Sequence, residues 1–582
     1  MNKLSDRSFI EAEVTRIADE LVKLGSRDAK GLYWLTPNSH AQVDMTESID
    51  LFNGNAGIIL FFLAIYRYNK KQEYLQTALE AAGRLLQHEQ VLHPQYYTFY
   101  GGATGILYVC IQLYKATGQS YYLQKALQLE QQYRPDYNNR VTQYDLLSGQ
   151  AGILLAVLHL YACTKEPSLI HSIEEIINKL ITGAHPGRTG LKWDTNKHGY
   201  DSLTGFSHGA SGIAFALLQT AHFFHAPGLQ YLATQAFEYE SNYYEPHTGN
   251  FMDLRVGAMR MTTIREQYND KLHDWPLAAF TPTMSGISSW AHGAAGCAIS
   301  RLFAYKITGD QLYASEAALD YSWLYFQQQK QIDYSLCSGY GGIAASFILA
   351  AQILHQPVWQ TRALTIARSA IEYYSKHHTY NSKIQHNIPD CGLFSGLAGV
   401  GYWLLGCLQP HATDNIIHPA LDVGCDGPNS IQEKFSVEEI KAQIKNRYHS
   451  ELITGLWQQH TGFLQFRQRR LLVQQRFEAF QEFTDTEWLK QHFITANHIV
   501  LINDGDEQTP VLYYCHETGI SHMPVSKFTI TLLQHFSKSE EVAVVAALIH
   551  EALFNNEDKK YVEQLIIEQV KELVKAGFLI SN

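Results

Sequence analysis

The chain has few cysteines and no long apolar run, and both absences exclude classes of protein to which it could belong. Its 582 residues hold eight cysteines, and none of them forms a Cys-x-x-Cys pair. This argues against a zinc ribbon or a disulfide framework and suits a reducing compartment. The longest apolar stretches, such as Gly57–Tyr66 and Ala151–Ala162, are shorter than the roughly 20 residues that span a bilayer. The first residues carry charges throughout, without an apolar signal core, so we expect a cytoplasmic protein without stable membrane insertion.

Positive charge is also scarce. The formal net charge is −11, and only 17% of the residues are charged. Binding of phosphate backbones needs a dense basic surface, so nucleic acid is not the expected partner. The apolar content of 46% describes a well-buried globular protein, and the length predicts more than one domain.

What the sequence does contain is a repeat. Seven Gly-x-x-Gly tetrads are each followed at once by an apolar run of helical length, as in SGQAGILLAVLHLYA. Successive tetrads are 48, 47, 60, 84, 46 and 57 residues apart, about the length of a helical hairpin. Such self-similarity is typical of repeat architectures. The tetrads begin at Gly54, Gly102, Gly149, Gly209, Gly293, Gly339 and Gly396.

Amphipathic stretches alternate with the apolar helices that start at the tetrads, and five of them are clear: Gln72–Gln90, Tyr121–Tyr133, Ser168–Thr182, Leu312–Gln329 and Val358–His377. Polar-faced outer helices around uniformly apolar inner helices are what a closed helical ring requires. We therefore predict a mainly α fold, a seven-fold (α/α) toroid of helical hairpins over residues 1–410. The inner helices would aim seven positive dipole ends at one central cavity. An insertion at 243–289 lengthens the fourth interval, and its role stays open.

The repeat pattern stops after Pro410. Residues 411–435 are predicted to be a linker or ring closure, and 436–490 a helical connector with basic residues at Arg467, Arg469 and Arg470. In 491–582 strand-like HIVLIN and VLYYCHETG are followed by HMPVS and by three expected helices, 528–536, 540–553 and 560–577. This order predicts a small α+β, winged-helix-like domain. Its ending, ELVKAGFLI, resembles leader-peptide recognition modules, although a winged helix used for dimerisation is also open.

Reactive side chains precede several tetrads. His208 precedes the fourth tetrad, and His292 follows Trp290 and Ala291 before the fifth. The sixth is preceded by Cys337 and Ser338, and Asp145 stands four residues before the third. On loops that face one cavity, side chains so distant in sequence could converge.

With seven tetrads in register and CGLFSGLAGVGYWLL as its last repeat, the chain resembles the lanthionine synthetase C-like family over about residues 30–410. The resemblance implies an α/α toroid that adds a peptide cysteine thiol across dehydroalanine or dehydrobutyrine, forming a thioether ring. It also implies a zinc ion that holds the thiol. Its usual ligands are a cysteine in the fifth repeat and a Cys-His pair before the sixth tetrad.

This chain departs from that pattern, with Ala291 at the first ligand position and Cys337-Ser338 at the pair. One thiolate cannot hold catalytic zinc, which needs three protein ligands. We therefore expect no metal, with zinc still possible through a rebuilt set of His208, His292 and Cys337. His208 and Asp145 match the family's proton-transfer positions, so they are the predicted catalytic residues. Trp290, His292, Cys337 and Ser338 are predicted to border the substrate cavity.

These observations favour a zinc-independent, lanthipeptide-type cyclase. Its expected partners are a dehydrated precursor peptide, with leader and core, and a separate dehydratase, since no dehydratase-like segment is recognisable. The alternative is a catalytically degenerate scaffold that binds the precursor and recruits a modifying enzyme. A thiol-conjugating toroid or a sugar-processing ring has no dedicated support in the sequence.

Overall fold

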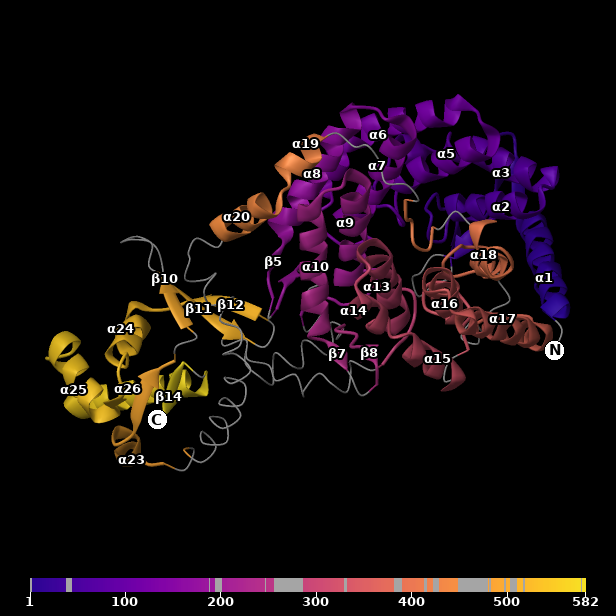
Figure 1. Cartoon of the computed structure of the whole chain (residues 1–582). Helices are drawn as coiled ribbons and strands as arrows, with labels where there is room; N and C mark the ends of the chain where they lie inside the picture. The colour runs from indigo at the N-terminus through magenta and orange to yellow at the C-terminus, as the bar shows by residue number, and fades with distance from the viewer. Residues whose placement is uncertain are drawn as a thin grey trace. The chain divides into compact units, whose positions relative to one another are not determined.

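A computed structural model shows two compact units (Figure 1). It describes residues 3–37, 44–187, 189–193, 201–245, 248–255, 286–328, 332–381, 390–412, 416–421, 429–447, 480, 483–496, 499–502, 510–516, 519–576 and 578–581. The first unit comprises Met1–His185, Gly190–Gly257 and Phe280–Gln443, and the second is mainly Ile444–Asn582. The basic cluster at Arg467, Arg469 and Arg470 lies outside the described residues.

Seven apolar inner helices begin at the tetrads, as predicted. They are α2 (Asn55–Asn69), α5 (Thr104–Thr117), α7 (Gln150–Thr164), α9 (Ala210–Phe224), α13 (Ala294–Thr308), α16 (Tyr340–Leu354) and α18 (Leu397–Leu408). Six of them take the first glycine of the tetrad as N-cap, and α5 starts two residues after Gly102. Their first three turns are buried on all sides, which explains why the apolar residues run without a polar stripe.

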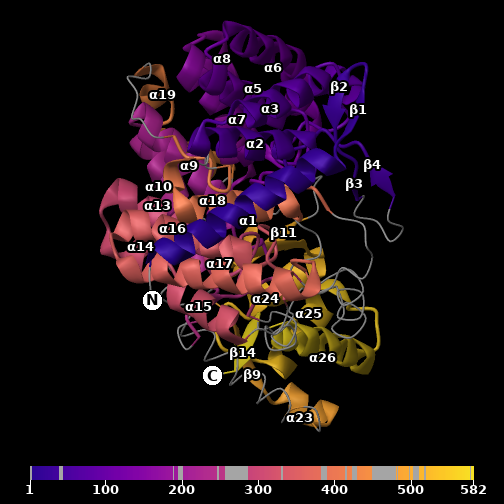
Figure 2. The ribbon, with the colours of Figure 1, turned by 90° about the vertical axis from the view of Figure 1, so that its right-hand side faces the viewer.

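The inner helices form a closed ring. Each packs against the next in chain order, and α18 packs against α2. Outer helices cover them, each paired with its own inner helix: α3 (Gln72–Leu85), α6 (Ser120–Arg140), α8 (Ser168–Gly183), α10 (Pro227–Ser241), α14 (Gln311–Ser315) with α15 (Leu319–Gln328), and α17 (Pro357–His377). The seventh outer helix comes from the other end of the chain, because α1 (Lys3–Leu24) packs on α18 (Figure 2). The seven-fold (α/α) toroid is thereby confirmed.

The second glycine of each tetrad allows the start of the inner helix to pack closely against the backbone of the preceding loop. A Cβ on Gly399 would lie 1.7 Å from the Leu393 carbonyl oxygen, and one on Gly212 would lie 2.0 Å from the Phe206 carbonyl oxygen. The same contact recurs in all seven repeats, always with the carbonyl of the apolar residue six positions earlier. The tetrad therefore fixes the loop that precedes each inner helix.

We expect Gly399→Ala to destabilise the ring by about 2–3 kcal/mol, because the contact is with backbone that cannot move aside. The matched control is Gly83→Ala in the outer helix α3, where a Cβ meets nothing within 4 Å. That substitution should stabilise the protein by about 0.5–1 kcal/mol, because alanine is the better helix former. Urea unfolding of both variants measures the difference, and equal effects would contradict this role of the tetrad.

A short segment, Ile416–Leu421, lies inside the ring, and we refer to it as the strap. The Tyr100 hydroxyl and the Trp290 indole N–H donate hydrogen bonds to the carbonyls of Ile416 and Ile417. His159 on α7 contacts the Pro419 carbonyl oxygen at 3.1 Å. Leu421 donates its N–H to the Gln219 side chain on α9, and His418 packs on Phe303 of α13. Only a segment within the ring can contact helices from so many sides. Residues 416–421, part of the region predicted as a linker or ring closure, thus fill part of the interior.

Short strands and helices complete the first unit. The strands are β1 (Ser26–Asp28) with β2 (Gly31–Tyr33), β3 (Thr36–Pro37) with β4 (Met45–Thr46), β5 (His185–Pro186) with β6 (Leu191–Lys192), and β7 (Tyr244–Glu245) with β8 (Asn250–Phe251). The helices are α4 (Glu89–Leu92), η1 (Pro410–Ala412), α19 (Asn429–Lys434) and, as far as Gln443, α20 (Val437–Arg447). None of the described helices is both long and apolar enough to cross a membrane.

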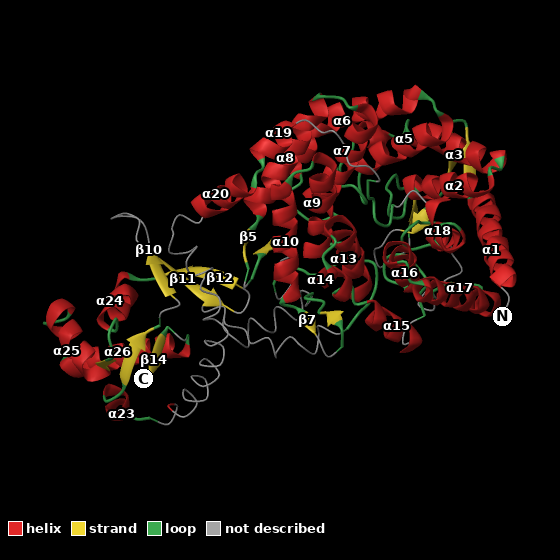
Figure 3. Ribbon diagram, in the orientation of Figure 1, coloured by secondary structure: helices red, strands yellow, loops and turns green. Residues whose placement is uncertain are grey.

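The second unit mixes strands and helices (Figure 3). The antiparallel sheet β10-β11-β12 consists of Ile499–Ile502, Val511–His516 and Gly519–Pro524. A smaller sheet, β13-β9-β14, consists of Glu540–Glu541, His492–Thr495 and Leu579–Ser581. The helices are α23 (Asp485–Leu489), α24 (Lys527–His535), α25 (Val542–Leu553) and α26 (Lys559–Lys575). They enclose a separate core that includes Trp488, Phe493 and Ile566. The two predicted strands and the three predicted helices lie close to observed ones, the segment HMPVS overlaps β12, and the winged-helix assignment stays a prediction.

Candidate functional site

Backbone hydrogen bonds join the loops that precede the inner helices. In six cases the N–H of the residue two positions before a tetrad donates to the carbonyl of the equivalent residue in a neighbouring repeat. The donor–acceptor pairs are Phe52–Tyr100, Leu147–Ser207, Ser207–Ala291, Ala291–Cys337, Cys337–Phe394 and Phe394–Phe52. We call these seven residues the loop ring. It brings side chains that are hundreds of residues apart in sequence to one end of the toroid.

His208 and Asp145 form an ion-pair contact at this end. His208 Nδ1 lies 3.1 Å from Asp145 Oδ2. The Asp145 side chain is 1% exposed and that of His208 is 32% exposed, so the carboxylate is buried while the imidazole reaches solvent. The sequence analysis expected that these two residues could converge, and in the structure their side chains are in contact.

The loop around Asp145 determines which nitrogen of His208 is protonated. Asp145 Oδ1 accepts the N–H of Ser148 at 2.5 Å, so Oδ2 is the oxygen directed at the histidine. An ionised carboxylate only accepts hydrogen bonds, so Nδ1 carries the proton in the neutral ring and donates it to Oδ2. This tautomer makes Nε2 the basic nitrogen.

Cys337 and Ala291 occupy adjacent positions of the loop ring, joined by the 3.1 Å bond from Ala291 N–H to the Cys337 carbonyl. Burial raises the pKa of the Cys337 thiol to about 12, with a further increase from Asp333 and an opposing effect of Arg255. Part of the residue is nevertheless accessible. The thiol is therefore protonated at neutral pH.

Ser338 is exposed and is held by its own loop. Its hydroxyl donates to Asp333 Oδ2 at 2.9 Å, and Asp333 Oδ1 accepts the Ser335 N–H at 2.8 Å. Repeat seven has the same arrangement with Ser395 and Asp390. The same Ser–Asp contact therefore occurs in a repeat that has no reactive residues nearby. This indicates that Ser338 stabilises its loop.

Trp290 is fully buried beneath the loop ring. Its indole donates to the Ile417 carbonyl of the strap at 2.7 Å, and its ring packs against Tyr100, Phe206 and Phe394. It belongs to the apolar set that occupies the same position in every repeat, six residues before the second glycine. In this structure Trp290 supports the wall of the site.

His292 lies beside His208, with ring centroids 6.1 Å apart and nearly parallel planes. It is 7% exposed, and its buried Nδ1 has no hydrogen-bond partner among the residues that the structure describes. Burial, with a smaller contribution from the charge of Arg255, lowers the pKa of His292 to about 3. The ring is therefore neutral and only weakly basic at neutral pH.

The sequence prediction missed Asp253 and Arg255, which lie in the insertion. Arg255 Nε donates to Asp253 Oδ1 at 2.9 Å, and the Arg255 side chain is 41% exposed. Burial opposes ionisation of Asp253, but the hydrogen bond and the positive charge of Arg255 hold the pKa of that carboxyl below its usual value. The positive charge of Arg255 lowers the pKa of His292 and opposes the rise in the pKa of Cys337. The only sequence signal was an Asp-x-Arg pair in a long insertion.

The residues present do not fit the family's zinc ion. Ala291 has no ligating atom, and the Ser338 hydroxyl donates to Asp333. Zinc ligands must lie about 2.0–2.3 Å from the metal. Among the residues that the structure describes, no group of three His, Cys, Asp or Glu side chains is arranged to hold a metal ion. The alternative set of His208, His292 and Cys337 is thus not assembled here.

Two consequences of the Cys337 environment can be measured. A thiol with a pKa of about 12 has a very small thiolate fraction at pH 7, so iodoacetamide should label Cys337 at least 100-fold more slowly than a small-molecule thiol. The labelling rate should rise about tenfold per pH unit up to pH 10 or above. Peptide mapping by mass spectrometry gives the rate. Labelling of Cys337 as fast as the model thiol would contradict a raised pKa.

Together these features define a closed α/α toroid with a histidine–carboxylate pair on the loops at one end of the ring. The family profile for lanthionine synthetase C-like protein matches residues 46–421. The chain belongs to the lanthionine synthetase C-like family.

Solved structures with related folds include nisin cyclase, at 14% identity and a TM-score of 0.48, covering 75% of this chain and 99% of that chain. Cellobiose 2-epimerase from Spirochaeta thermophila is 12% identical, with a TM-score of 0.35 and coverage of 71% and 97%. An α-1,6-mannanase from Salegentibacter is 10% identical, with a TM-score of 0.36 and coverage of 70% and 98%. At these values we draw nothing about activity from the likenesses. No curated protein matches the chain significantly.

Proposed function

We propose that this protein is a thioether-forming peptide cyclase that adds cysteine thiols of a precursor peptide to dehydroalanine or dehydrobutyrine without zinc. The observation that carries the proposal is the His208–Asp145 pair at the loop ring of a lanthionine synthetase C-like toroid. Ala291 and Ser338 stand at positions where the family has zinc ligands. Their presence favours acid–base chemistry over activation of the thiol by a metal.

In this mechanism His208 Nε2 takes the proton from the peptide thiol. The thiolate attacks Cβ of the dehydroamino acid, and the C=C electron pair moves onto the adjacent carbonyl as an enolate. The protonated His208 then returns the proton to Cα, so the peptide gains and loses no atoms. Asp145 holds the ring in the required tautomer and stabilises the imidazolium formed in between.

The enolate oxygen needs a positive group, and we assign that role to Arg255. A pre-organised donor at a developing oxyanion contributes about 10²- to 10³-fold to the rate. The guanidinium is partly exposed, and its charge acts on the pKa of both Cys337 and His292. His292 is neutral, and Cys337 is a protonated thiol. Neither supplies the positive charge that the enolate requires.

Arg255→Met is expected to lower kcat for cyclisation by about 100-fold with little change in KM, because the enolate forms only after binding. The matched control is Arg362→Met, since Arg362 pairs with Asp320 on the outer helices. Cyclisation kinetics of a dehydrated peptide measure both. A raised KM at constant kcat would instead make Arg255 a substrate-binding residue.

The second unit would hold the leader peptide by strand addition. In the sheet β10-β11-β12 the outer strands each pair, within the described residues, with β11 alone. An extended peptide can add to such an edge through main-chain hydrogen bonds.

The direct test is incubation of the full chain with a chemically dehydrated peptide that contains one cysteine and one dehydroalanine. A cyclase removes the free thiol, as measured with a thiol-reactive reagent, while the peptide mass stays constant. A catalytically degenerate scaffold would bind the peptide with no change in thiol count. That outcome would overturn the proposal and favour the scaffold alternative.

A further inference from the structure

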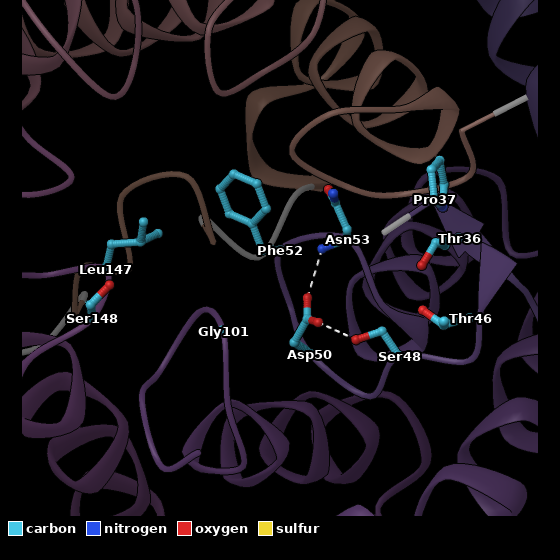
Figure 4. A pocket seen from close by; sticks show the side chains of 10 residues that line it. All are labelled: Thr36, Pro37, Thr46, Ser48, Asp50, Phe52, Asn53, Gly101, Leu147 and Ser148. Atoms are coloured by element: carbon cyan, nitrogen blue, oxygen red, sulfur yellow. Dashed lines mark hydrogen bonds between the residues drawn. The ribbon is translucent and has the colours of Figure 1, made fainter. Parts of the chain in front are cut away.

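A cavity of about 320 Å³ lies beside the loop ring, between the first three repeats and the strand pair β3–β4 (Figure 4). Ligand pockets generally range from about 300 to 1,000 Å³, so this one suits a single side chain with its adjacent backbone. The lining residues are Thr36, Pro37, Thr46, Ser48, Asp50, Phe52, Asn53, Gly101, Leu147 and Ser148. None of the predicted site residues is among them.

The cavity adjoins the reactive pair. Leu147 and Ser148 line it, and Ser148 donates its backbone N–H to Asp145, whose other oxygen contacts His208. A peptide whose reacting residue lies at His208 would therefore place a flanking residue at this cavity.

Among the described residues, the lining carries a negative charge and no positive one. Asp50 is the one ionisable side chain in that described lining, and the other polar members are hydroxyls and one amide. Asp50 Oδ1 accepts the N–H groups of Asn53 and Gly54 at 2.7 and 3.1 Å, and Oδ2 accepts the Ser48 hydroxyl (Figure 4). These donors are neutral, and within the described part of the chain Asp50 is in no ion pair. The charge is thus stabilised but uncompensated.

Comparison with repeat three shows how the cavity differs from the reactive site. Asp50 and Asp145 both stand four residues before the first glycine of a tetrad, and both accept a backbone N–H three residues later. In repeat three the second oxygen meets the imidazole of His208. In repeat one its partner among the described residues is the Ser48 hydroxyl at the cavity wall.

We propose that this cavity is a substrate subsite for an alkylammonium or guanidinium group of the precursor peptide, with Asp50 as the counter-charge. The walls at Pro37, Phe52 and Leu147 suit the methylene groups of such a side chain. The proposal rests on the proposed function for its peptide substrate, but its test needs no catalysis.

The probes are N-acetylated hexapeptides without cysteine or dehydroamino acids, identical except for lysine or norleucine at one position. Isothermal titration with the full chain should show the lysine peptide binding at least tenfold more tightly. A norleucine peptide with a free N-terminus tests whether a terminal amine is bound equally well. Because these peptides cannot react, an inactive enzyme with the lysine preference would refute the proposed function but not the subsite.

Asp50→Asn keeps an acceptor for the backbone N–H groups and removes the charge, so it should abolish the lysine preference. Thr46→Lys, which places a cation at the wall without altering the loop, should abolish it too. The matched control is Asp390→Asn, since Asp390 holds the loop of repeat seven but does not line the cavity. Equal binding of both peptides, no binding at millimolar concentration, or a preference unaffected by Asp50→Asn and Thr46→Lys would overturn the proposal.

Discussion

Replacing His208 by alanine is expected to lower the rate of thioether formation by 10²- to 10⁴-fold, the usual contribution of a general acid–base group. The imidazole is partly exposed and is paired with a buried carboxylate. KM for the dehydrated peptide should change little, because the proton moves only during the reaction. The measurement is loss of free thiol under single-turnover conditions.

Two further variants test whether the loss of rate is specific to the His208–Asp145 pair. Asp145→Asn preserves the shape of the loop but presents an amide that no longer fixes the Nδ1–H tautomer, so it should also lose most of the rate. His171→Gln removes an exposed outer-helix histidine that pairs with Glu175, and it should leave the rate unchanged. Normal cyclisation by His208→Ala would remove His208 from the mechanism, whatever the other variants do.

The second large effect is acid destabilisation of the ring. Burial lowers the pKa of His159 and His418 to about 4 and that of His292 to about 3, from 6.5. In the unfolded chain these histidines bind protons below pH 6.5, whereas in the folded chain they stay neutral. Unfolding therefore takes up protons, and stability falls as the pH drops from 6.5 towards 4.

For three histidines the loss between pH 8 and pH 5.5 amounts to about 4 kcal/mol. Urea-unfolding midpoints of the full chain, followed by far-ultraviolet circular dichroism, should shift accordingly. His159→Gln retains an N–H for the Pro419 carbonyl and does not titrate, so it should remove about a third of the pH dependence. Equal stability at the two pH values would contradict neutral burial of these rings.

The ring fold could be predicted from sequence because each repeat carries its own signal. The close contact of the second glycine with the carbonyl six residues earlier is local, so the tetrads mark where the inner helices begin. The amphipathic outer helices follow from periodicity in the same way. The convergence of His208 and Asp145 then needed only the assumption that equivalent loops share one end of the ring.

The features that the sequence did not predict depend on contacts between segments that are distant along the chain. Residues 416–421 look like a linker in the sequence, and it is contacts such as those of Tyr100 and Trp290 with their carbonyls that show them to lie inside the ring. Arg255 belongs to an insertion outside the repeat pattern, and the cavity at Asp50 needs the strands β3 and β4 as a wall. No local pattern specifies such pairings, since the contacts form only when the ring closes.

The central claim is that this chain closes thioether rings without zinc. The most direct measurement is cyclisation of the dehydrated peptide by protein dialysed against a chelator, with zinc quantified by elemental mass spectrometry in the same sample. We predict undiminished thiol loss at well below 0.1 zinc per chain. Activity that disappears with the metal and returns when zinc is added would contradict the account, and a zinc site would have to be sought.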